Sequence, residues 1–268
     1  MNRLLRIDMF KNLFTITSAL AISLLLTGCI PKSRIPVDTR FYGSLDQQPG
    51  RHLLILLPGR GDSMSDFEKR GLVHSLRSRH PQVDIIAVDL HMGYYIDESF
   101  LTRLKQDVFT PAKLKGYQQT WLFGISMGGM GALFYTKEYP EDINGTIIFA
   151  PFLGEEELIE EIIAAGGIRK WLPGKIQSDD HERKLWAWLK ERTPDQLFLG
   201  FGKQDKFSMA HQLLQSWLPP EHSISIRGKH RWPVWIELWD LLLERLEVDD
   251  QAIRITIPSD VVTETRKQ

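Results

Sequence analysis

A serine between two glycines follows a short apolar segment of this sequence. Residues 124–128 read Gly-Ile-Ser-Met-Gly, with the apolar run 121–123 before them and a predicted helix that ends at Tyr139 after them. A sharp turn from strand to helix would project the Ser126 hydroxyl above the sheet, and the flanking glycines lack the Cβ atoms that would clash there. Such a hydroxyl can attack an acyl carbon if a neighbouring base takes its proton. The same residues also fit a tight turn that carries an inert serine.

Short apolar segments recur along the chain and predict the strands that would position this serine. They are residues 52–57, 83–90, 120–124, 145–150 and 196–201, with a weaker sixth at 222–226. Segments without polar alternation suit a parallel sheet that is covered on both faces. Apolar residues at helical spacing predict helices over 66–79, 128–139 and 233–246. The alternation predicts an α/β fold, with an open, mostly parallel sheet and helices on both faces.

One interval, residues 153–193, is too long for a simple connection between two strands. It contains two segments with helical character, 155–165 and 181–190, and we interpret it as a small helical cap over the carboxyl edge of the sheet. Its three tryptophans are Trp171, Trp186 and Trp188. They could line a pocket for an acyl or aromatic group, or they could pack in the core.

Residues 124–133 (GISMGGMGAL) resemble the nucleophile elbow in the esterase branches of the α/β-hydrolase family, and the resemblance extends over about residues 50–246. In this family the chain order is serine, acid, histidine. His230 lies between the last predicted strand and the final helix, where the family places its base, and Asp205 ends a Gly-x-x-Asp segment like the one that holds its acid. The resemblance implies Ser126 as nucleophile, His230 as general base and Asp205 as the carboxylate that orients the imidazole.

Two backbone amides are expected to hold the oxyanion that develops during acyl transfer. One belongs to Met127, directly after the serine. The resemblance places the second in the loop after the first long strand, where the Arg60 amide is the first choice and Gly59 the next. In this loop the chain has Pro58 at the position where many relatives have histidine. The Arg60 side chain either reaches over the site, where it would favour an anionic substrate, or is exposed to solvent.

The first residues of the chain have the features of a secretory signal. Residues 1–11 carry three basic side chains, and the apolar run 13–26, of about 14 residues, is shorter than the roughly 20 that span a membrane. Residues 26–29 (LTGC) resemble the lipobox of bacterial lipoproteins, which implies cleavage before Cys29 and a diacylglyceryl group on its sulfur. An unprocessed signal anchor with an incidental thiol is the alternative.

These features predict the organisation of the chain. We expect a lipoprotein signal peptide over residues 1–28, a lipidated tether over 29–49, the α/β-hydrolase domain with its cap over 50–248, and a C-terminal tail over 249–268. Ile30, rather than aspartate, follows the cysteine, and the resemblance to bacterial lipoproteins then implies the outer membrane in a Gram-negative source that follows their sorting rule. The expected location is therefore the bacterial cell envelope, with the domain facing the periplasm. The single cysteine excludes a disulfide within the domain.

The composition and the absence of certain motifs exclude several classes of function. The formal net charge of −1 provides no overall field that would attract nucleic acid. The sequence has no metal-binding or nucleotide-binding motif, and we expect no cofactor and no protein partner. The expected function is hydrolysis of carboxylic esters, small-molecule or lipid-like, through an acyl-enzyme by a lipid-anchored protein. A thioesterase, peptidase or acyltransferase with the same three residues, and a catalytically inactive lipoprotein scaffold, are the alternatives.

Overall fold

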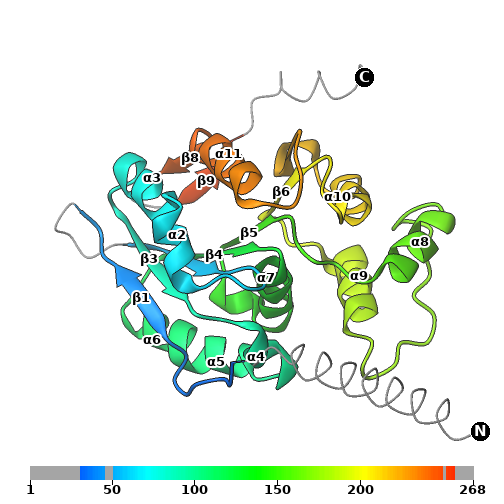
Figure 1. The fold of residues 1–268 in the computed structure, drawn as a ribbon, viewed down its shortest axis with the longest axis horizontal. Helices are drawn as coiled ribbons and strands as arrows, with labels where there is room; N and C mark the ends of the chain where they lie inside the picture. The colour runs from blue at the N-terminus through cyan, green and yellow to red at the C-terminus, as the bar shows by residue number, and fades with distance from the viewer. Residues whose placement is uncertain (1–30, 46–50, 250–251, 257–268) are drawn as a thin grey trace, which may run out of the picture. The chain divides into compact units, whose positions relative to one another are not determined.

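A computed structural model describes residues 31–45, 51–249 and 252–256 of the chain. Its centre is a seven-stranded sheet in the order β1-β3-β2-β4-β5-β6-β7 (Figure 1). The strands are β1 (Thr39–Tyr42), β2 (His52–Leu57), β3 (Val83–Val88), β4 (Gln119–Ile125), β5 (Gly145–Phe149), β6 (Leu197–Gly202) and β7 (Ser223–Ile226), and a separate antiparallel pair is formed by β8 (Leu246–Val248) and β9 (Ile253–Ile255). In the large sheet, β1 is antiparallel to β3 and the other neighbouring strands are parallel.

Helices cover both faces of this sheet. They are α2 (Met64–Lys69), α3 (Leu72–Arg79), α4 (Met92–Ile96), α5 (Phe100–Arg103), η1 (Leu104–Phe109), α6 (Thr110–Leu114), α7 (Met127–Glu138), α8 (Glu156–Ala164), α9 (His181–Arg192), α10 (Ser208–Gln215) and α11 (Trp232–Leu243), with short 3₁₀ turns η2 (Pro140–Asp142) and η3 (Pro220–His222). In β2, Leu53, Ile55 and Leu57 belong to the core cluster under α4 to α10, whereas Leu54 and Leu56 belong to the cluster under α2, α3 and α11. The predicted α/β architecture, with a mostly parallel sheet between two helical layers, is confirmed.

The edge strand β1 corrects the expected organisation, because its residues fall within the segment 29–49 that we interpreted as a tether. Thr39 pairs with Val88, and the strand runs antiparallel to β3. An edge strand has one neighbour and buries few side chains, so no apolar run marks it in the sequence. Likewise β9 lies within the expected tail 249–268 and pairs with β8. The folded domain is therefore longer at both ends than predicted.

Two helical regions also differ from the prediction. The helix expected over residues 66–79 is divided into α2 and α3 by Gly71, whose φ of +87° interrupts the helical path. Between β3 and β4, where we predicted no helix, the chain forms α4 and then a continuous run of α5, the π-helix η1 and α6. Leu104, Val108 and Ala112 are buried along this run at helical spacing, so the sequence did carry a signal for it.

The interval 153–193 forms α8 and α9, and α9 packs on α7 while α8 packs on α10. Trp171 and Trp186 are buried and donate their indole hydrogens to Glu161 and to a backbone carbonyl, both over 2.7 Å. Trp188 is partly buried against the same core cluster. Of the two alternatives for these tryptophans, packing in the core is the one that is confirmed.

Candidate active site

Ser126 stands at the turn between the end of β4 and the start of α7. Its φ of 54° and ψ of −114° are unusual for a residue that has a side chain. The Ser126 amide donates to the Phe149 carbonyl over 2.8 Å, and the Ser126 carbonyl accepts from the amides of Met130 and Phe152, each over 3.1 Å. The turn is therefore held in its strained conformation by the neighbouring strand, helix and loop.

The two glycines of this turn are required by close backbone approach. A Cβ at Gly124 would lie 2.1 Å from the carbonyl oxygen of Gly128. A Cβ at Gly128 would lie 2.3 Å from the carbonyl oxygen of Leu57. Both distances are far inside van der Waals contact, and the atoms met belong to the backbone of the tightly packed core. The spacing of the two glycines around Ser126 thus follows from how closely α7 is set against β2 and β4.

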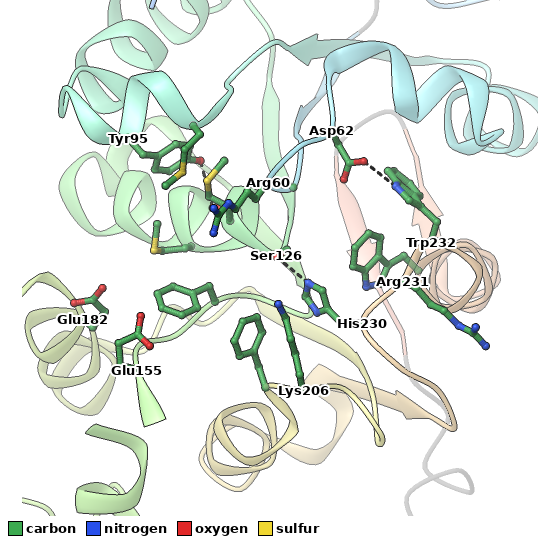
Figure 2. Close-up of a pocket in the computed structure, with 17 residues that line it drawn as sticks. Arg60, Asp62, Tyr95, Ser126, Glu155, Glu182, Lys206, His230, Arg231 and Trp232 are labelled. Carbon is green, nitrogen blue, oxygen red and sulfur yellow. Dashed lines mark hydrogen bonds between the residues drawn. The ribbon is translucent and has the colours of Figure 1, made fainter. Parts of the chain in front are cut away.

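His230 bridges Ser126 and Asp205, which are far apart in the sequence. Its Nε2 lies 2.9 Å from the Ser126 Oγ, as the dashed line in Figure 2 marks, and its Nδ1 lies 2.7 Å from the Asp205 Oδ2. An ionised carboxylate can only accept, so a proton on Nδ1 satisfies it and leaves Nε2 to accept the hydroxyl hydrogen of Ser126. The Asp205 side chain is fully buried, whereas that of His230 retains 15% exposure. The structure brings together the three residues that the sequence analysis selected.

The loops that carry Asp205 and His230 follow β6 and β7, which are neighbours in the sheet. The Gln204 amide donates to the Gly228 carbonyl over 2.8 Å, and this bond joins the two loops directly. A Cβ at Gly228 would lie 2.3 Å from the Val234 side chain in α11. Glycine at this position therefore lets the histidine loop pass close to the helix that follows it.

Aromatic rings and a backbone amide fix the orientation of the imidazole and the carboxylate. The rings of Phe207 and Trp235 meet the His230 ring edge-on, at centroid distances of 5.3 and 5.0 Å. The Asp205 Oδ1 accepts the Phe207 amide over 2.9 Å, so its other oxygen, Oδ2, is the one that faces the imidazole. Neither side chain can rotate without losing these contacts.

The residues predicted for the oxyanion lie on two adjacent loops, because β2 and β4 are neighbouring parallel strands. The Asp62 amide donates to the Gly59 carbonyl over 3.1 Å and closes a tight turn, in which the Arg60 amide has no backbone acceptor among the described residues. Met127 is the first residue of α7, where an amide has no acceptor within the helix. Gly59, Arg60 and Met127 all line the same cavity as Ser126. The residues predicted for the oxyanion and Ser126 therefore belong to the wall of one cavity.

The Arg60 side chain is exposed to solvent and also lines this cavity, so the two positions considered for it, over the site and in solvent, are compatible. Figure 2 shows its guanidinium between Tyr95 and Ser126. Within the described part of the chain it forms no ion pair. A cation is therefore available to a substrate near the serine.

A hydrogen bond ties the turn of Gly59 and Arg60 to the histidine loop. The Trp232 indole donates to the Asp62 Oδ1 over 3.0 Å, and Trp232 follows His230 closely in the chain. Burial raises the pKa of Asp62, and the hydrogen bond from Trp232 acts in the opposite direction. The bond therefore offsets part of the cost of burying the Asp62 carboxylate, and it fixes one loop relative to the other.

The Ser126 hydroxyl opens into a cavity of about 790 Å³. Beyond the predicted residues, its wall consists of the apolar or aromatic Met92, Tyr95, Met130, Phe152, Phe207, Trp232 and Trp235 and the charged Asp62, Glu155, Glu182, Lys206 and Arg231. Figure 2 shows Glu155 and Glu182 at the end of the cavity away from His230. These residues come from separate helices and loops, so the order of residues in the sequence does not show that they share one cavity. Only Lys206 and Arg231, which adjoin Asp205 and His230 in the chain, could have been found by their position.

The remaining histidines after Ser126 have other surroundings. His211 is buried in α10, with its Nε2 2.8 Å from the Pro151 carbonyl, and burial lowers its pKa to about 4, so it stays neutral. Pro151 directly precedes Phe152, whose amide holds the Ser126 carbonyl. His181 and His222 lie against phenylalanine rings. Among the residues that the structure describes, no group of three or more His, Cys, Asp or Glu side chains could hold a metal ion.

Comparisons with known proteins agree with this architecture. Residues 100–186 match the model of a family described as serine aminopeptidase, S33, a stretch that contains Ser126 but neither Asp205 nor His230. A search of curated proteins found no match. Solved structures with the same fold include S-formylglutathione hydrolase (FrmB) from Staphylococcus aureus, with 13% identity, 78% of this chain and 91% of that chain covered and a TM-score of 0.60.

Two further structures have similar values. The fluorophosphonate-binding serine hydrolase FphF from Staphylococcus aureus has 12% identity, covers 78% of this chain and 98% of its own, and has a TM-score of 0.55. Est1E from Butyrivibrio proteoclasticus has 16% identity, covers 78% of this chain and 93% of its own, and has a TM-score of 0.52. At such low identity, these likenesses establish the fold alone.

Proposed function

The chain has the α/β-hydrolase fold, and from this premise we propose that it is a serine hydrolase that cleaves carboxylic esters through an acyl-enzyme. The observation that carries the proposal is the position of His230, with one ring nitrogen 2.9 Å from the Ser126 hydroxyl and the other 2.7 Å from the Asp205 carboxylate. A serine hydroxyl is a weak nucleophile at neutral pH, and an adjacent oriented base is what activates it.

The reaction has two halves. In the first, Ser126 Oγ attacks the ester carbonyl while His230 Nε2 takes the hydroxyl proton, and Asp205 stabilises the imidazolium. The bond to the leaving alcohol then breaks, and His230 gives its proton to the alcohol oxygen. In the second half, water attacks the acyl-enzyme, His230 accepts a water proton and returns it to Ser126, and the carboxylic acid leaves.

The amides of Met127 and Arg60 hold the oxygen that becomes negative in both halves. They lie on loops after the adjacent strands β4 and β2 and line the cavity beside Ser126. Each such donor contributes about 3 kcal/mol to the stabilisation of the transition state. The Arg60 guanidinium adds a positive charge at the same side of the cavity, which favours substrates with an anionic group near the reacting carbonyl.

A panel of chromogenic substrates tests this function. We expect the purified protein to hydrolyse p-nitrophenyl esters, with Ser126→Ala reduced to background and the folding of the variant checked by circular dichroism. Thioester substrates and acyl transfer to added alcohols belong in the same panel, because the three residues serve all of these reactions. A folded wild-type protein that hydrolyses none of them would leave the inactive scaffold as the explanation.

Peptide hydrolysis is the second candidate, and a specific observation favours it. Glu155 and Glu182 line the end of the cavity away from His230, and neither pairs with a cation among the described residues. Two carboxylates at this place suit the amino group of a peptide N-terminus, in keeping with the family description of the matched segment. Aminoacyl p-nitroanilides, compared in wild type and in Glu155→Gln and Glu182→Gln, separate this activity from ester hydrolysis.

We further propose that the domain is anchored to the bacterial cell envelope, in the outer membrane, through acylation of Cys29. The proposal depends on the sequence pattern of residues 1–29, which lies outside the described residues. In the described part of the chain, no helix has the length and apolar character that crossing a bilayer requires. Incorporation of labelled palmitate into wild type but not into Cys29→Ser is the expected result, and labelling of the variant would contradict it.

A further inference from the structure

The direction of β1 determines where the chain enters the domain. The strand is antiparallel to β3, so its first residue, Thr39, pairs with Val88 at the carboxyl end of β3. The amide of Asp89 also donates to the carbonyl of Asp38 over 2.8 Å. The carboxyl ends of the parallel strands form the edge of the sheet at which Ser126, Asp205 and His230 lie. The segment that precedes β1 is therefore attached at the catalytic edge and not at the opposite one.

That segment is fixed to α4 by several hydrogen bonds. The Arg34 amide donates to the Tyr94 hydroxyl over 2.9 Å, and this hydroxyl donates to the Arg34 carbonyl over 3.1 Å. The Ser33 hydroxyl donates to Asp97 directly after the helix. The same helix contributes Met92 and Tyr95 to the wall of the cavity. The N-terminal segment and the cavity thus share one short helix.

The covalent chain limits how far Cys29 can be from this helix. Only Ile30, Pro31 and Lys32 separate Cys29 from Ser33. Even a fully extended chain of this length spans at most about 14 Å. Acylation of Cys29 would therefore hold α4, and with it one wall of the cavity, close to the headgroups of the bilayer.

The surface around this attachment has the chemistry of a membrane contact. Ile35 is 78% exposed and Ile96 is 52% exposed, and each lies next to residues of the hydrogen bonds between the segment and α4. Arg34 is exposed beside Ile35 but pairs with Asp38, and the exposed Asp97 and Glu98 follow Ile96, so contact with a bilayer would depend on the two isoleucines. Large apolar side chains at the tip of such a surface insert at the boundary between headgroups and acyl chains.

We propose that this attachment face, formed by residues 33–35 and Ile96, lies against the lipid bilayer, and that the cavity takes its substrate from the membrane as an ester of a bilayer-resident amphiphile. The inference rests on the proposed ester hydrolysis and on the proposed acylation of Cys29. The apolar and aromatic part of the cavity wall suits an acyl chain. The adjacent cationic Arg60 suits an anionic headgroup close to the ester.

Fluorescence quenching tests the position of the face without reference to activity. Full-length acylated protein carries no other cysteine, so Ile96→Cys and Leu114→Cys can each be labelled with an environment-sensitive dye. Leu114, 85% exposed, is the matched control because it ends α6 shortly before β4 starts, at the amino edge of the sheet. In vesicles of phosphatidylethanolamine and phosphatidylglycerol, we expect nitroxide-labelled lipids to quench the dye at position 96, and aqueous iodide to quench the dye at position 114. Equal iodide quenching at both positions would overturn the proposal.

Kinetics in the same vesicles test the substrate class. The Ile35→Asp/Ile96→Asp variant is expected to hydrolyse a vesicle-embedded long-chain ester about tenfold more slowly than wild type, since it loses the insertion of two apolar side chains. Its rate on soluble p-nitrophenyl acetate is expected to stay unchanged, as are both rates in Leu114→Asp. A parallel fall on both substrates, or no fall on the embedded ester, would overturn the membrane-resident substrate. Failure of wild type to cleave either ester above Ser126→Ala would instead contradict the proposed function and remove the substrate assignment, while the quenching result would still report the docking face.

Discussion

Replacing Asp205 by asparagine is expected to reverse the tautomer of His230 while keeping the fold. The Asp205 Oδ1 accepts the Phe207 amide over 2.9 Å, so in the variant the carbonyl oxygen of the asparagine must occupy this position. Its NH₂ group then takes the place of Oδ2, 2.7 Å from the His230 Nδ1. A donor at this point forces Nδ1 to accept, so the ring proton moves to Nε2 and points at the Ser126 hydroxyl. The base can then no longer take the serine proton.

The expected loss of kcat follows from this change in the tautomer of His230. A wrongly protonated imidazole in such a triad lowers kcat by about 10⁴-fold, which corresponds to about 5.5 kcal/mol of the activation barrier. The assay is kcat and KM on a p-nitrophenyl ester, with circular dichroism to check that the variant folds. KM is expected to change little, because Asp205 does not line the cavity. In a His230→Ala background the same replacement should have no further effect. A loss below tenfold, or an equally large loss in the His230→Ala background, would refute the reasoning.

Three further substitutions test the positioning of the site. Gly128→Ala should destabilise the fold by about 2 kcal/mol or more and abolish ester hydrolysis, because its Cβ would lie 2.3 Å from the Leu57 carbonyl oxygen; thermal unfolding and the rate on a p-nitrophenyl ester measure this. Trp232→Phe removes the hydrogen bond to Asp62. Burial already raises the pKa of Asp62, so without this bond the ionised carboxylate becomes less favourable in the folded state. Urea unfolding should therefore find a larger loss of stability near neutral pH than near pH 4. Burial lowers the pKa of His211 from 6.5 to about 4, so as the pH falls the unfolded state takes up a proton before the folded state does. Between these two pH values the free energy of unfolding should drop by up to about 3 kcal/mol. His211→Gln should remove that part of the pH dependence.

One outcome for each of these three substitutions would contradict the reasoning behind it. For Gly128→Ala, a stable and fully active variant would contradict the packing argument for the elbow. For Trp232→Phe, a loss of stability that is the same at both pH values would mean that Asp62 does not report the missing bond. For His211→Gln, an unchanged pH dependence of unfolding would show that another group is responsible.

The sequence predicted the central strands well because they are continuous apolar segments. A strand such as β2, with apolar residues facing both core clusters, has no other stable place than the middle of a covered sheet. Ser126 could be predicted because the elbow requires glycine at fixed positions, and Asp205 and His230 because the resemblance to the α/β-hydrolase family implies an acid and a base after particular strands. These constraints are local, so they are visible in the order of residues.

The rest depends on contacts between distant segments. β1 is held by one neighbour, and it has four residues, three of them exposed, so it forms no apolar run that would identify it. Glu155, Glu182 and Tyr95 line one cavity although they come from the start of α8, from α9 and from α4, which are separate in the sequence. Trp232 belongs to the core cluster under α2, α3 and α11, and its indole also reaches Asp62 across the site. No periodicity in one segment determines which side of it will face another.

Labelling with a fluorophosphonate tests the central claim most directly, because only an activated serine reacts with it quickly. We predict that wild type gains one adduct, that peptide mapping places it on Ser126, and that His230→Ala loses nearly all of the reaction rate while remaining folded. An adduct on another serine, or equally fast labelling of Ser126 in the His230→Ala variant, would contradict the account.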